Sequence, residues 1–94
     1  MSHRDVFVVS TARTAIGTFG GSLKDVPNTQ LATTAVKAAI ARSGLAPDAV
    51  GHVVMGNVIP TDTKDAYLSR VAAIDAGCPI ETPAFNVNRL CGSG

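Results

Sequence analysis

Short apolar runs and amphipathic stretches follow one another along this chain. Continuous apolar runs at Val6–Val9 and within residues 52–58 are rich in β-branched side chains, which is typical of strands covered on both faces. A third strand is predicted over residues 84–88. Its side chains alternate between two sets, with Phe85 and Val87 on one face and Ala84, Asn86 and Asn88 on the other.

Two amphipathic helices are predicted between these strands. The first has Asn28 as its N-cap and Gly44 as the glycine that follows its end. Its apolar stripe consists of Leu31, Ala32, Ala35, Val36, Ala39 and Ile40. The second begins at Asp62 or Thr63 and stops at Gly77. Its stripe consists of Tyr67, Leu68, Val71, Ala72 and Ala76.

The order strand, loop, helix, strand, helix, strand predicts an α/β fold with a mostly parallel sheet and right-handed crossovers. Residues 11–28 form a long connecting loop, and a loop of this length is often functional. This loop contains the run IGTFGG, which matches neither of the two common phosphate-binding glycine patterns. Tight turns therefore explain its glycines better than a bound phosphate does.

Composition narrows the class of protein. The chain has 94 residues, 46% of them hydrophobic and 16% charged, with a net charge of +1. One small domain fits this length, and the charge balance favours neither nucleic acid nor an anionic membrane as a partner. The apolar runs are too short to span a bilayer, and no secretory signal is visible, so the cytoplasm is the expected location.

The two cysteines, Cys78 and Cys91, are expected to be reduced thiols, and their spacing with the two histidines does not suit zinc. Cys91 follows the third strand, where open α/β sheets bind ligands. If a helix begins there, its N-terminus would lower the pKa of the thiol and stabilise an oxyanion, as acyl transfer by a nucleophilic cysteine requires. The alternative is a buried, inert cysteine, which is our interpretation of Cys78.

Three further side chains are candidate ligands or bases. Arg13 and Arg70 suit an anionic ligand, but arginines are more often solvated or engaged in structural ion pairs. His52 is expected to be a hydrogen-bonded or exposed histidine rather than a general base.

The segments VFVVSTARTAIGTFGGSLKDV, VVMGNVI and NVNRLCGSG resemble the start of a thiolase, of the acetyl-CoA acetyltransferase and 3-ketoacyl-CoA thiolase family. The resemblance covers essentially the whole chain. It implies a thiolase-like fold, of which residues 1–94 are an incomplete N-terminal domain containing the first βαβαβ part. It also implies that Cys91 is the nucleophile that an acyl-CoA acylates, with its backbone N–H in an oxyanion hole.

In such a cycle two acetyl-CoA give acetoacetyl-CoA and CoA through an acyl-cysteine, or the reverse, without a metal or redox cofactor. The resemblance further implies a role in fatty acid metabolism and a homo-oligomer, either a dimer or a homotetramer. The family's histidine in a G-H-P segment, its second cysteine in a C-x-G segment and its CoA-holding loop have no match here. We therefore expect residues 1–94 alone to be inactive.

Three alternatives stay open at this point. The parent enzyme can be a longer-chain degradative 3-ketoacyl-CoA thiolase rather than a biosynthetic one. The chain can also be a non-catalytic structural or assembly module. A nucleotide-binding α/β domain with an incidental cysteine is the third, and the missing phosphate fingerprint argues against it.

Overall fold

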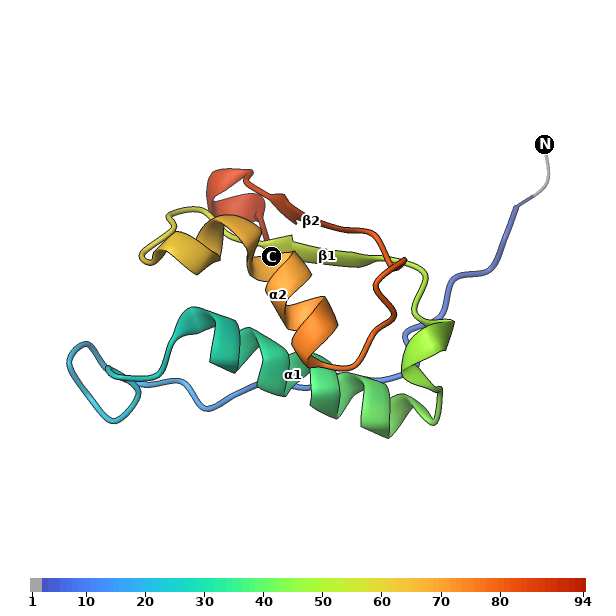
Figure 1. The fold of residues 1–94 in the computed structure, drawn as a ribbon, viewed down its shortest axis with the longest axis horizontal. Helices are drawn as coiled ribbons and strands as arrows, with labels where there is room; N and C mark the ends of the chain where they lie inside the picture. Colours follow the sequence, from blue (N-terminus) through green and yellow to red (C-terminus); the bar gives the residue numbers. More distant parts are fainter. Residues whose placement is uncertain (1–2) are drawn as a thin grey trace.

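The computed structural model describes residues 3–94, and from α1 onward its helices and strands alternate as the sequence predicts. In chain order, the helices and strands are α1 (Asn28–Ser43), β1 (Val53–Gly56), α2 (Leu68–Asp75) and β2 (Ala84–Val87). Short 3-10 turns precede or follow them, namely η1 (Pro47–Ala49), η2 (Thr63–Tyr67) and η3 (Leu90–Gly92). Figure 1 shows α2 lying between the two strands and the long helix α1, and α2 contacts both.

The two strands are parallel and pair in register, with Val53 opposite Ala84 and Val54 opposite Phe85. This confirms the α/β class and the parallel sheet. Val53 is buried and Ala84 packs against the same core cluster, whereas Val54 and Phe85 are 53% and 49% exposed. One face of the sheet is therefore covered by α2, and the other face presents apolar side chains to solvent.

The core is built from small side chains. The fully buried Ala72 and Ala73 of α2 allow the helix to approach the sheet closely, where Val53 and Cys78 meet them. Leu68, Ala72 and Ala76 of the predicted stripe are buried. Tyr67 is not, because it belongs to the 3-10 turn before α2, whose period differs from that of the helix. Its placement on the buried stripe was wrong.

The strand predicted at Val6–Val9 is absent from the structure. This run pairs with no strand, because β1 and β2 bond only to each other. Its side chains are among the most exposed apolar groups of the described residues, from 90% at Val6 to 63% at Val9. The prediction of a covered strand was wrong, because a strand also needs a neighbour that supplies hydrogen bonds.

The helix ends follow the predictions in part. Gly44, with a φ of 75°, follows α1 as expected, and Asp62 caps η2 by accepting a hydrogen bond from the Lys64 N–H. Asn28 is not an N-cap. It is the first residue of α1, and its side chain donates to Thr61 Oγ1 at 3.0 Å and to Asp65 Oδ2 at 2.9 Å. Partners distant in the sequence therefore determine what Asn28 does.

Candidate active site

Cys91 lies where β2 ends, in the 3-10 turn η3, and its free thiol is exposed. Figure 1 shows this turn at the carboxyl end of the two strands, beside the loop that follows β1. Ligands of open α/β sheets bind at this edge. Cys78 is different: it is buried against Val53 and Ala73, and its N–H donates to the Ala73 carbonyl at 2.9 Å. Its predicted structural role is confirmed.

The turn around Cys91 has an unusual backbone. Leu90, the residue before the cysteine, has a φ of 52°, and it is the one non-glycine residue with positive φ among residues 3–94. The Gly92 N–H donates to the Arg89 carbonyl and the Ser93 N–H to the Leu90 carbonyl. Residues 90–92 form a 3-10 turn rather than an α-helix. No α-helix therefore begins at Cys91 within the described residues.

The other candidate side chains make their observed contacts away from Cys91. Arg70 donates to the carbonyls of Thr82 and Ile80, each at 2.8 Å, so it holds the loop before β2. The His52 ring meets Phe85 edge-on, with centroids 5.0 Å apart. Arg13 lies on the exposed loop and reaches the neighbouring Thr14 carbonyl at 3.5 Å.

A buried carboxylate that the sequence analysis missed lies at the start of η2. Asp65 is 1% exposed, and its Oδ2 accepts hydrogen bonds from the N–H and hydroxyl of Thr61, from the Asp62 N–H and from Asn28. The Thr61 N–H is the main cause that lowers the pKa of Asp65 below its ordinary value, although burial opposes this effect. The spacing of Asp62 and Asp65 in a capping box was the available signal.

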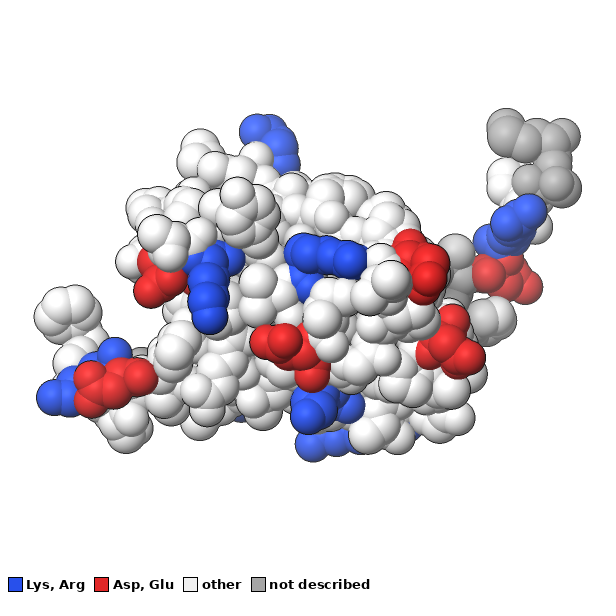
Figure 2. Space-filling view, viewed as in Figure 1, with Lys and Arg blue, Asp and Glu red and all other residues white. Residues whose placement is uncertain are grey.

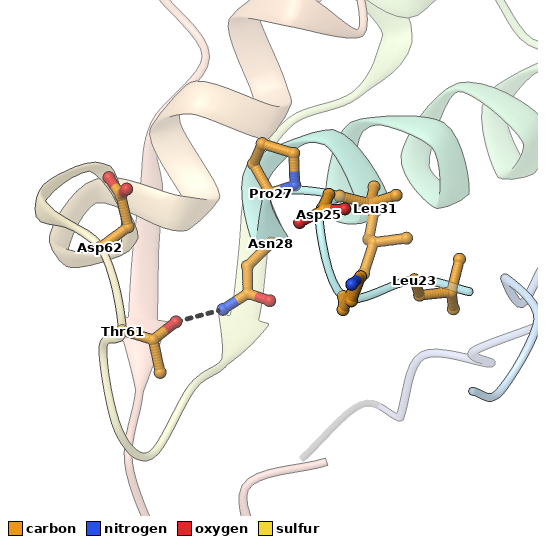
Figure 3. A pocket seen from close by; sticks show the side chains of 9 residues that line it. Leu23, Asp25, Pro27, Asn28, Leu31, Thr61 and Asp62 are labelled. Carbon is orange, nitrogen blue, oxygen red and sulfur yellow. Dashed lines mark hydrogen bonds between the residues drawn. The ribbon is translucent and has the colours of Figure 1, made fainter. Parts of the chain in front are cut away.

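A pocket of about 330 Å³ opens between the loop before α1 and the loop before η2, and it is shown in Figure 3. Asn28 and Thr61 are hydrogen-bonded across it, and Cys91 is not among its lining residues. The pocket is therefore separate from the turn that carries Cys91. On the face in Figure 2, basic and acidic side chains are interspersed.

Within residues 3–94, no three His, Cys, Asp or Glu side chains come together as metal ligands would. No helix in the described part of the chain has the length and apolarity to cross a membrane.

Comparison with known proteins decides the family. The family described as "Thiolase, N-terminal domain" matches residues 6–94. The chain belongs to the thiolase family. This confirms the resemblance and the fold class.

Individual thiolases match nearly the whole chain. It is 59% identical over 91 residues to the beta-ketothiolase BktB of Cupriavidus necator, and 47% identical over 90 residues to the acetyl-CoA acetyltransferase of the same organism. The matches cover 97% and 96% of this chain, and 23% of each relative, so the chain spans about a quarter of their length.

The fold agrees as well. A crystal structure of human mitochondrial 3-ketoacyl-CoA thiolase in complex with CoA aligns with a TM-score of 0.90 at 45% identity. That alignment covers 94% of this chain and 22% of the human one. One of these thiolases is named for acetyl-CoA and another for 3-ketoacyl-CoA. The likeness alone does not choose between the two reactions.

Proposed function

We propose that the protein containing this chain transfers acyl groups between coenzyme A thioesters through an acyl thioester on Cys91. Its membership of the thiolase family supports acyl transfer as the class of reaction. The position of Cys91 carries the assignment to this residue, because its free thiol is exposed at the carboxyl end of β2. Cysteine is also the most nucleophilic neutral-pH side chain available for such a step.

The reaction is a two-step exchange. The Cys91 thiolate attacks the carbonyl carbon of acetyl-CoA, the bond from that carbon to the CoA sulfur breaks, and CoA leaves with the proton that the cysteine lost. A base then removes a proton from the α-carbon of a second acetyl-CoA. The carbanion attacks the carbonyl carbon of the acetyl-cysteine, a carbon–carbon bond forms and the bond from that carbon to the Cys91 sulfur breaks. The released Cys91 thiolate takes back a proton from the base. The products are acetoacetyl-CoA and CoA.

The second step needs groups beyond those at Cys91. We propose that residues 1–94 supply the nucleophile and that the base and the CoA-holding loop come from further segments of the complete protein. No resident cofactor is required in this scheme, and the complete enzyme is a cytoplasmic homo-oligomer. Purified residues 1–94 should therefore show no thiolytic turnover. Turnover by these residues alone would refute the proposal that further segments supply the base and the CoA-holding loop.

The length of the acyl chain that the complete enzyme prefers is a finer question. We propose acetyl-CoA and acetoacetyl-CoA as the preferred pair, with a longer-chain 3-ketoacyl-CoA thiolase as the competing specificity. Relatives named for both kinds of substrate match this chain at similar identity. The ratio of kcat/KM for acetoacetyl-CoA to that for a long-chain 3-ketoacyl-CoA, measured in the thiolytic direction, separates the two.

The test of the nucleophile is the intact mass of the complete protein after incubation with acetyl-CoA. One acetyl group should be added and should map to Cys91, and Cys91→Ser should accept none, because an unactivated hydroxyl is a far weaker nucleophile near neutral pH. Cys78→Ala is the matched control, since that thiol is buried in the core, and it should be acetylated like the unaltered protein. Full turnover by Cys91→Ser would overturn the proposal.

A further inference from the structure

The turn that carries Cys91 is fastened to the residues that leave β1. The Asn57 N–H donates to the Val87 carbonyl at 3.0 Å, which extends the parallel pairing beyond the strands. One residue further, Asn88 Nδ2 donates to the Val58 carbonyl at 3.2 Å. Two successive residues before the turn are thus bonded to two successive residues after β1. The neighbouring strand therefore takes part in placing the cysteine.

Hydrogen bonds within the turn also stabilise it, although the backbone conformation of Leu90 is unfavourable. Asn88 Oδ1 accepts from the Leu90 N–H at 3.0 Å. The Ser93 hydroxyl donates to the Leu90 carbonyl at 2.7 Å and accepts from the Arg89 N–H at 2.8 Å. The positive φ of Leu90 is disfavoured for a branched side chain, so it persists only where surrounding contacts enforce it. Asn88 supplies such a contact from inside the turn and anchors the turn to β1 as well.

Gly56, the last residue of β1, makes the close approach of the turn possible. A Cβ atom at this position would lie 2.7 Å from the Ser93 carbonyl carbon and 3.1 Å from the Ser93 Cβ, and closer still to the Ser93 carbonyl oxygen. The obstructing atoms belong mainly to the backbone, so they cannot rotate away. Any side chain at position 56 must push the segment that follows Cys91 away from β1.

We propose that Gly56 and Asn88 are positioning residues for Cys91. Gly56 leaves the space into which the Ser93 carbonyl fits, and Asn88 joins the turn to Val58 while it holds the Leu90 N–H. Together they set where the thiol stands relative to the carbonyl carbon of a bound thioester. This inference rests on the proposed acyl transfer, because it assigns these residues their role through the nucleophile.

The experiment compares Gly56→Ala with Gly51→Ala in the complete protein. Gly51 precedes β1, and a Cβ there would meet no atom within 4 Å, so it is the matched control. A displacement of the nucleophile by about 1 Å can cost on the order of 100-fold in rate. We therefore expect the kcat for acetyl transfer to fall about 10- to 100-fold in Gly56→Ala, with KM changed less than about threefold. Gly51→Ala should keep both constants.

A second readout does not depend on acyl transfer. The rate at which iodoacetamide alkylates Cys91, measured against pH, reports the thiolate fraction and access of the folded protein. Gly56→Ala should change the rates in this profile, whereas a merely destabilised fold would keep them and lower only the thermal midpoint. If the unaltered protein transfers no acetyl group, the proposed function fails, and the alkylation profile still decides the positioning roles.

Asn88→Asp keeps the inference testable if Gly56→Ala does not fold. This change retains an oxygen for the Leu90 N–H, removes the donor to Val58 and adds a negative charge. It should lower kcat as Gly56→Ala does. The added charge alone changes the thiolate fraction, so the alkylation profile of this variant does not test the inference. Unchanged kcat in Asn88→Asp, or unchanged kcat and an unchanged profile in a folded Gly56→Ala, would overturn the inference.

Discussion

Asn86 of β2 serves as a cap for α2, although it lies on a different element. The Ser69 N–H, in the first turn of α2, donates to Asn86 Oδ1 at 3.0 Å. N–H groups in the first turn of an α-helix have no acceptor within the helix, so an acceptor from outside is needed. Asn86 Nδ2 also donates to the carbonyls of Asp65 and Ala66, at 3.3 and 3.2 Å.

Replacing Asn86 by Ala removes all three hydrogen bonds, but the free-energy costs of losing them are unequal. The Asp65 carbonyl keeps a donor from Asn57, and Ala66 is exposed, so water can replace the bond to its carbonyl. Ser69 is only 2% exposed, and its N–H loses its acceptor where water has little access. A buried donor without a partner costs about 1–3 kcal/mol, and a lost cap costs about the same. We expect a loss of about 2 kcal/mol, or about 30-fold in an opening equilibrium.

Amide hydrogen exchange measures this loss locally. The Ser69 amide should exchange about 30-fold faster in Asn86→Ala than in the unaltered protein. Asn86→Asp keeps an acceptor for the Ser69 N–H, but its second carboxylate oxygen would face the carbonyls of Asp65 and Ala66. Ser69 should therefore exchange more slowly than in Asn86→Ala and faster than in the unaltered protein. The Cys78 amide, bonded to Ala73 at the other end of α2, should not change in either variant. Unchanged exchange of Ser69 in Asn86→Ala would refute the capping role.

Two further predictions concern Asp65 and Gly77. The lowered pKa of Asp65 in the folded protein means that its stabilising effect is complete above the unfolded value of about 3.9, and is lost as the pH falls from there through the folded pKa. Thermal midpoints between pH 7 and pH 3 should therefore fall less steeply in Asp65→Asn, and equal slopes would contradict the prediction. Gly77 has a φ of 98°, and its missing Cβ would meet only the Pro47 ring, at 3.9 Å. Gly77→Ala should thus cost about 1–2 kcal/mol in a urea titration through backbone strain alone. Gly51→Ala, without that strain, should not lower stability, and equal losses in the two variants would rule out strain as the cause.

Local patterns along the chain were sufficient for several features. The apolar stripe of α1, its end at Gly44, the cap at Asp62 and the strands around Val53 and Ala84 depend on side-chain periodicity and on backbone preferences of single residues. Such properties act over a few neighbouring positions, so the order of residues contains them. The segment that ends in Cys91 was likewise found from its own residues, as a cysteine that follows a strand.

Other features depend on residues that are distant in the chain. Val6–Val9 looked like a strand, but only a neighbouring strand could make it one, and the structure pairs β1 with β2 alone. Asn28 looked like a cap, but the buried carboxylate of Asp65 takes its side chain instead. The contact between Gly56 and Ser93 has no signal in the sequence, because it arises when two parallel strands end side by side. The sequence by itself determined most of the elements and the position of the candidate cysteine, Cys91. The tertiary structure alone decided which backbone and polar groups meet, since hydrogen bonds and close contacts depend on distance in space and not along the chain.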